Sequence, residues 1–192
     1  MLDELEAEAR SRFEAGEYDH ALAEFSVLRE VRARREGPYS VPYLRALHAS
    51  VRCMRFLQLW QDTDLLCQEL HGKYVRTHGR GEADTVDVAK HWAWALLHLD
   101  AVNAAVALYV RTADALWDCD RPTARRLLGA AAVHAGSTVD PLDGLTLVHT
   151  TELAASFTDL RRLLPNDSGA APSSDFDGAT PGRYPDRGAV SR

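Results

Sequence analysis

The chain has 192 residues, 46% of them hydrophobic and 26% charged, and its formal net charge is −6. This length favours a single domain with a short extension, and the apolar content is high enough for a hydrophobic core. The negative net charge argues against bulk electrostatic attraction to nucleic acid or to anionic lipid, so neither a nucleic-acid partner nor a membrane partner is expected.

Apolar residues recur every three to four positions along most of the chain, which predicts a succession of helices. The second helix is expected to end at Gly37-Pro38, because glycine and proline together are a strong stop signal. A seventh helix should open at Pro122, and an eighth should run from about Leu142 to Leu164. The helices then pair as four hairpins, at about 2–37, 40–79, 82–119 and 121–164.

The composition of the chain changes at Pro165. The stretch 165–192 contains Asn166-Asp167-Ser168-Gly169, Pro172-Ser173-Ser174 and Pro181-Gly182. Such a segment offers too little apolar surface to offset the entropy cost of ordering it. The sequence therefore predicts a helical repeat domain over 1–164 and a disordered tail over 165–192.

A repeat with a period of about 42 residues runs through the first two thirds of the chain. Gly16-Glu17-Tyr18 aligns with Gln58-Leu59-Trp60 and, more weakly, with Asp100-Ala101-Val102. Periods of this length indicate a solenoid, in which no single unit can bury its own apolar face. The fourth hairpin fits the period loosely, as expected of a terminal cap.

Gly16, Tyr18, Ala21 and Phe25 fit the pattern Gly-x-Tyr-x-x-Ala-x-x-x-Phe one for one. This run resembles the tetratricopeptide repeat (TPR), in the long variety seen in kinesin light chains and in many actinobacterial proteins. The resemblance implies an all-α fold, a right-handed α-α superhelix (a TPR-like solenoid) of three to four helical hairpins with a disordered C-terminal tail. It also implies that the first helix of each hairpin lines a concave groove, and that the protein is a non-catalytic protein- or peptide-binding module.

Arg45, His48, Arg52 and Arg55 follow one another at spacings of three, four and three, which places all four on one face of the third helix. The groove positions of the resembled family add Arg10 on the first helix and two residues on the fifth. The predicted partner-binding groove comprises Arg10, Arg45, His48, Arg52, Arg55, Lys90 and Trp94.

Two interpretations of this groove are open. In the first, the cations and the Trp94 ring hold an acidic or carboxylate-bearing peptide, because a guanidinium pairs with a carboxylate in bidentate geometry. In the second, the arginines are a solvated helix face, paired with Glu82, Asp84 and Asp87 of the next repeat.

No metal site and no cofactor are expected from the sequence. His91 and His98 share a helical face but lie two turns apart, about 10 Å, which is too far for one ion bound about 2 Å from each nitrogen. Cys53, Cys67 and Cys119 have neither zinc-ligand nor disulfide-scaffold spacing, and no nucleophile with a suitably spaced base is visible. We therefore expect that the protein is not an enzyme.

Two further classes of function stay open beside the binding module. One is a regulatory or sensor component that binds a signalling peptide or a small ligand. The other is a self-associating structural scaffold, for which a homodimer is the simplest form. The sequence has no visible signal peptide or apolar membrane-length stretch, so a cytoplasmic location is expected, and the identity of a protein or peptide partner is not encoded in any motif.

Overall fold

The computed structural model describes residues 1–135 and 140–163, and every regular element within those ranges is an α-helix. This confirms the prediction of an all-helical fold, whereas the predicted disordered tail over 165–192 lies outside the described residues. None of the described helices is both long and apolar enough to cross a membrane. The helices are α1 (Leu2–Glu14), α2 (Tyr18–Glu36), α3 (Val41–Phe56), α4 (Trp60–Thr77), α5 (Ala83–His98), α6 (Val102–Leu116), α7 (Arg121–Ala135) and α8 (Thr150–Leu163).

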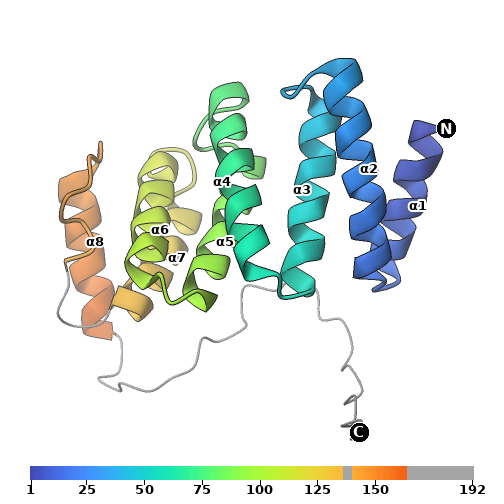
Figure 1. Ribbon diagram of the computed structural model, residues 1–192. Coiled ribbons are helices and arrows are strands. Elements are labelled where there is room, and N and C mark those ends of the chain that lie inside the picture. The colour runs from blue at the N-terminus through green and yellow to red at the C-terminus, as the bar shows by residue number, and fades with distance from the viewer. Residues whose placement is uncertain (136–139, 164–192) are drawn as a thin grey trace, which may run out of the picture.

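The helices form a row that runs from α1 at one end to α8 at the other, with α5 overlapping α4 and α7 overlapping α6 in this view (Figure 1). Each helix packs against its neighbours in the chain, and α3 also packs against α5. This is the arrangement of a helical-repeat solenoid, built here from the hairpins α1–α2, α3–α4, α5–α6 and α7–α8. The division of the chain into a repeat domain and a separate tail stays a prediction.

The turn inside each of the first three hairpins has the same backbone conformation. Gly16, Gln58 and Asp100 have φ values of 81°, 57° and 58°, in the left-handed region. These are the residues that align in the sequence repeat. Glycine adopts this conformation without strain, and aspartate tolerates it better than glutamine does.

The repeat also sets how closely the helices of a hairpin approach one another. Ala21, Thr63 and Ala105 occupy equivalent positions near the start of the second helix, and each is 0% exposed. Thr63 carries a hydroxyl there, and its Oγ1 donates a hydrogen bond to the Leu59 carbonyl at 2.7 Å. A small side chain at this position therefore recurs even where the sequence alignment is weak.

The hydrophobic core consists of three clusters that follow one another along the row. Ala46 of α3 packs in the first cluster with α1 and α2, and Leu47 of the same helix packs in the second with α4. On α5, Val88 joins the second cluster and Ala93 the third, with α6, α7 and α8. α3 and α5 thus each share their apolar side chains between two clusters, which fixes both helices firmly.

The eighth helix begins later than the sequence predicts. It was expected from about Leu142, but α8 starts at Thr150. The Asp140 carboxylate accepts a hydrogen bond from the Leu142 N–H, and Gly144 takes a left-handed conformation with φ 71°. Both features stabilise a turn instead of a helix. The prediction of the helix start was wrong because the apolar residues of this segment lie in a loop that packs on the core.

That loop is held by Asp114 of α6, whose carboxylate accepts hydrogen bonds from the backbone N–H groups of Val148 and His149. The His149 ring contacts the same carboxylate at 3.2 Å and the Asp118 carboxylate at 2.9 Å. Desolvation acts to lower the pKa of His149, but the interactions with the two carboxylates outweigh it, so this pKa lies above its ordinary value of 6.5. The charged imidazole is therefore favoured in the folded protein.

The left-handed Gln58 gives a test of the repeat turn. We expect Gln58→Gly to raise the free energy of unfolding by about 0.5–1 kcal/mol, because the relief of left-handed strain exceeds the entropy cost of glycine. Gln68→Gly, at an exposed position in the interior of α4, is the matched control and should lower stability by about 1 kcal/mol. Urea unfolding followed by circular dichroism measures both, and a destabilised Gln58→Gly variant would contradict the account.

The His149 contacts predict a pH dependence of stability. Because the folded-state pKa is raised, the contribution is complete below about pH 6.5 and is lost as the pH rises through the folded-state pKa. His149→Gln should therefore lower Tm more at about pH 5.5 than at about pH 8.5. His20→Gln, at an exposed position of α2, serves as the control. Equal losses of Tm at both pH values would show that His149 is not charged in the fold.

Candidate functional site

A cavity of about 580 Å³ opens between α1, α3 and α5, the first helices of the first three hairpins, and we call the surface around it the concave face. Four of the residues that the sequence analysis assigned to a groove line it: Arg10 of α1 and Arg45, His48 and Arg52 of α3. The remaining lining residues are Glu6, Phe13, Glu14, Phe25, Arg32, Ala46, Ala49, Tyr74, Asp84 and Asp87. Whether this surface binds a partner stays a prediction.

Arg55, Lys90 and Trp94 are not among the described residues that line the cavity. Arg55 and Trp94 lie nearer the C-terminal ends of α3 and α5 than the lining residues of those helices do. The Arg55 guanidinium lies over the Phe56 ring at 4.7 Å, and the Trp94 ring packs edge-on against His98 at 5.0 Å. Whether Arg55, Lys90 and Trp94 contribute to a partner-binding surface stays a prediction.

Glu6 of α1 organises one side of the cavity. Its carboxylate pairs with the exposed Arg10 guanidinium at 2.9 Å and with the guanidinium of Arg32 on α2. Arg32 is only 4% exposed, and it also donates a hydrogen bond to the Pro42 carbonyl at 2.9 Å. Arg32 therefore has a structural role, tying α1 and the start of α3 to α2, that the spacing of arginines in the sequence did not reveal.

Arg45 and Arg52 of α3 differ from the other two arginines that line the cavity. Arg45 and Arg52 are exposed, and among the described residues their guanidinium groups make no hydrogen bond or ion pair. Arg52 lies over the Phe13 ring at 5.2 Å. These two cations are consequently available to an anionic ligand at the cavity.

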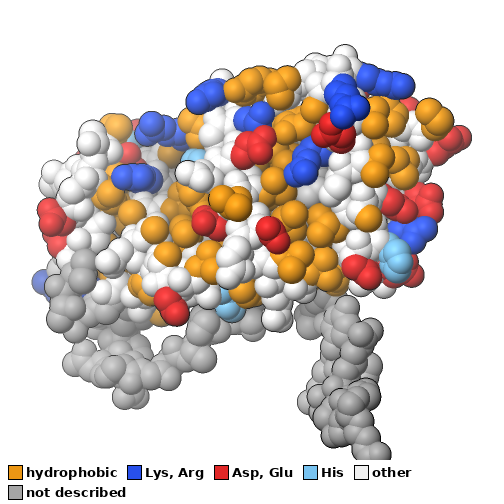
Figure 2. Space-filling model, in the orientation of Figure 1, with side chains coloured by type: hydrophobic (Ala, Val, Ile, Leu, Met, Phe, Trp, Pro, Cys, Tyr) orange, Lys and Arg blue, Asp and Glu red, His pale blue; other side chains and the backbone are white. Residues whose placement is uncertain are grey.

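The lining of the cavity is balanced in formal charge, because four arginines face four carboxylates, those of Glu6, Glu14, Asp84 and Asp87. The groove is therefore mixed in charge, whereas the sequence analysis expected a basic surface. On the face of the molecule seen in Figure 2, acidic and basic side chains are likewise interspersed with apolar ones, and neither sign forms a continuous patch.

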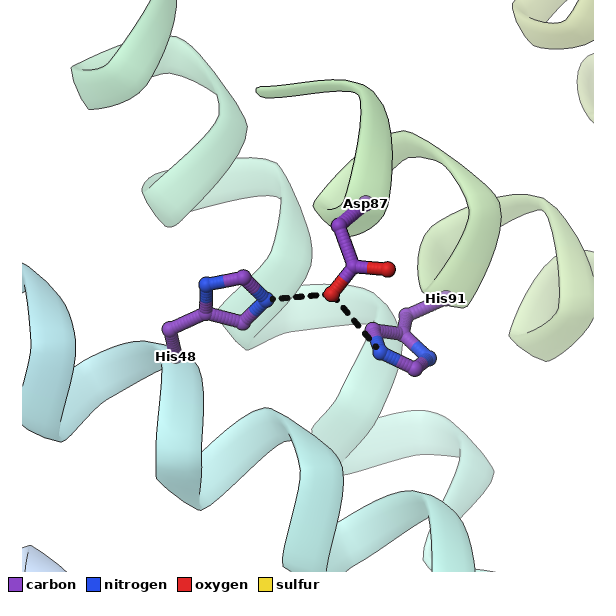
Figure 3. Close-up of side chains that lie close together, drawn as sticks. All are labelled: His48, Asp87 and His91. Atoms are coloured by element: carbon purple, nitrogen blue, oxygen red, sulfur yellow. Dashed lines mark hydrogen bonds and ion pairs between the residues drawn. The ribbon is translucent and has the colours of Figure 1, made fainter. Parts of the chain in front are cut away.

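One edge of the cavity carries a cluster of His48, Asp87 and His91, in which the carboxylate lies between the two imidazoles (Figure 3). Asp87 Oδ2 is 3.1 Å from His48 Nε2 and 3.5 Å from His91 Nε2. His48 comes from α3, and the other two residues lie one turn apart on α5. On its other side, His48 Nδ1 is 3.4 Å from the hydroxyl oxygen of the buried Tyr74.

The environment of the cluster sets the ionisation of its members. Burial lowers the pKa of His91, an effect that outweighs the attraction of Asp87 and is reinforced by Arg55. Burial acts to raise the pKa of Asp87, but its contacts with His48 and His91 outweigh it, and the pKa falls far below its ordinary value. A neutral His91 next to an ionised Asp87 is thus favoured at neutral pH.

The spacing of histidines within single helices did not reveal this cluster. His48 lies on α3, 39 residues before Asp87 in the chain. The Asp87–His91 spacing of four was the available signal, but only the contact between α3 and α5 completes the set.

The sequence matches no known protein-family model and no curated protein. The fold is similar to a solved structure, BtubC (BKLC) from P. vanneervenii, with a TM-score of 0.63 and 14% sequence identity. The alignment covers 90% of this chain and 69% of that one. At this identity the similarity shows a TPR-like helical-repeat fold alone, and the narrower resemblance to kinesin light chain repeats stays a prediction.

Arg32 and Arg10 both pair with Glu6 but should differ in how much they contribute to stability. Arg32→Gln should lower the free energy of unfolding by about 2–4 kcal/mol, because it breaks a buried, hydrogen-bonded ion pair and leaves the Pro42 carbonyl without its donor. Arg10→Gln removes an exposed partner of the same carboxylate and should cost less than about 1 kcal/mol. Chemical unfolding of both variants measures the difference, and similar losses would refute the structural role of Arg32.

Proposed function

We propose that this chain is a non-catalytic binding module that holds an acidic segment of a protein partner on the concave face formed by α1, α3 and α5. The observation that carries the proposal is the pair of exposed arginines, Arg45 and Arg52, whose guanidinium groups have no ion-pair partner among the described residues. The helical-repeat fold supports a protein-interaction role in general, and these two guanidinium groups favour an acidic ligand.

Arg45 and Arg52 suit a carboxylate ligand better than the other two arginines of the cavity do. Arg10 and Arg32 already share the Glu6 carboxylate, so a ligand would have to compete with that residue. Arg45 and Arg52 have no such competitor, and a charge-assisted bidentate contact to each is stronger than a neutral hydrogen bond. The Phe13 ring beneath Arg52 supports the guanidinium plane and leaves its edge for the ligand.

The geometry also restricts the ligand. Arg45 and Arg52 are seven residues apart, so their Cα atoms are separated by about 10 Å along the axis of α3. Residues i and i+3 of an extended polyproline-type peptide are about 9 Å apart and point to the same side. A segment with two acidic residues at that spacing would reach both guanidinium groups at once, and a cavity of about 580 Å³ accommodates a few of its side chains.

Selection of random peptides on the immobilised protein tests the proposal. We expect the selected peptides to be enriched in Asp and Glu, with pairs at i and i+3, and to bind more weakly as salt concentration rises. Arg45→Glu/Arg52→Glu should lower their affinity at least about tenfold, because each lost charged contact is worth about 1.5 kcal/mol or more.

The control must carry the same change in net charge. Arg35→Glu/Arg125→Glu alters two exposed arginines that do not line the cavity, and it should leave the affinity within about twofold. Circular dichroism verifies that both double variants are folded. Peptides without acidic enrichment, or equal losses in the two double variants, would overturn the proposal.

A further inference from the structure

We propose that His48, Asp87 and His91 form a binding site for one divalent transition-metal ion of the Zn²⁺ class, at the edge of the concave cavity. The three side chains come from two helices that pack against each other, and one nitrogen of each imidazole faces the same carboxylate oxygen of Asp87 (Figure 3). Two imidazoles and a carboxylate are a ligand set that Zn²⁺, Co²⁺ and Ni²⁺ accept.

The distances between the ligand atoms fit a single ion. With bonds of about 2.0–2.1 Å, two ligand atoms on one tetrahedral Zn²⁺ lie about 3.3–3.5 Å apart. Asp87 Oδ2 is 3.1 Å from His48 Nε2 and 3.5 Å from His91 Nε2. All three ligand atoms lie within 4.8 Å of one another. Because two ligand atoms on one ion are at most about 4.2 Å apart, binding requires the imidazole rings to turn around the Asp87 oxygen until all three atoms meet that limit.

The backbone holds these side chains in place before any ion binds. Asp87 and His91 are one helical turn apart, the spacing that puts two ligands on the same face of a helix. The Tyr74 hydroxyl contacts His48 Nδ1 at 3.4 Å, in the position of the outer partner that orients a metal-bound imidazole. His48 and His91 are both largely buried, with side chains 12% and 13% exposed.

His91 supplies a further geometric indication. Its buried Nε2 has no partner that meets hydrogen-bond geometry, and its contact with Asp87 Oδ2, at 3.5 Å, is longer than a good hydrogen bond. A metal ion would give this buried nitrogen a direct bond.

The site opens toward the proposed partner. His48 and Asp87 line the cavity, so the coordination positions that the protein leaves free face the concave side. A bound divalent ion would give this formally balanced lining a charge of about +2 and would offer a further contact to a carboxylate. This consequence for partner binding rests on the proposed function, whereas metal binding itself does not.

Isothermal titration of the chelator-treated full-length chain with Zn²⁺ tests the site. We expect one ion per chain, together with an increase in Tm on addition of Zn²⁺, because a ligand of the native state stabilises it. His48→Gln, Asp87→Asn and His91→Gln should each weaken Zn²⁺ binding about tenfold or more. Asp87→Asn keeps the shape of the carboxylate, so it separates loss of metal binding from loss of folding.

His98→Gln is the matched control, since His98 lies on the same helix two turns beyond His91, and it should retain wild-type affinity. Absence of Zn²⁺ binding, or binding that survives in Asp87→Asn and falls in His98→Gln, would overturn the site. Peptide selection in the presence of Zn²⁺ and, separately, of a chelator distinguishes the proposed metal site from the proposed arginine surface. Acidic peptides bound only with Zn²⁺ support both, and acidic peptides bound without any response to Zn²⁺ support the arginine surface and refute the contribution of the metal to partner binding.

Discussion

The packing of α3 against α5 is the contact on which the concave face depends. These helices are separated in the chain by α4, yet each contributes side chains to two neighbouring clusters of the core, as Leu47 and Val88 do in the cluster they share. This double burial leaves α3 little freedom to shift. It therefore fixes the distance between the arginines of α3 and the acidic face of α5, and it brings His48 to Asp87.

The charged side chains that line the cavity fall into two groups, those paired within the fold and those without an ion-pair partner among the described residues. Arg32 is buried, and its pairing with Glu6 holds α1, α2 and the start of α3 together. Exposed Arg45 and Arg52 make no such ion pair among the described residues, so the fold does not depend on pairing of their charges. The same division applies to the acidic residues, because Asp87 is engaged by two histidines while the exposed Asp84, on the same face of α5, has no ion-pair partner among the described residues.

The helices and the repeat could be predicted from the sequence, since both depend on local spacing. Gly16, Gln58 and Asp100 align in the sequence and share a backbone conformation, even though their side chains differ. The start of α8 and the His48–Asp87–His91 cluster could not be predicted in this way. The first depends on how a loop packs on Asp114, and the second on a contact between helices far apart in the chain.

We propose that a partner binds on the concave face formed by α1, α3 and α5. Mapping the backbone amide shifts of the isotope-labelled protein by NMR, on addition of a selected acidic peptide, tests it most directly. The account predicts that the perturbed residues cluster around Arg45, His48 and Arg52 and extend to Asp87 across the cavity. Perturbations concentrated on α6, α7 and α8, with the α3 residues unaffected, would contradict it.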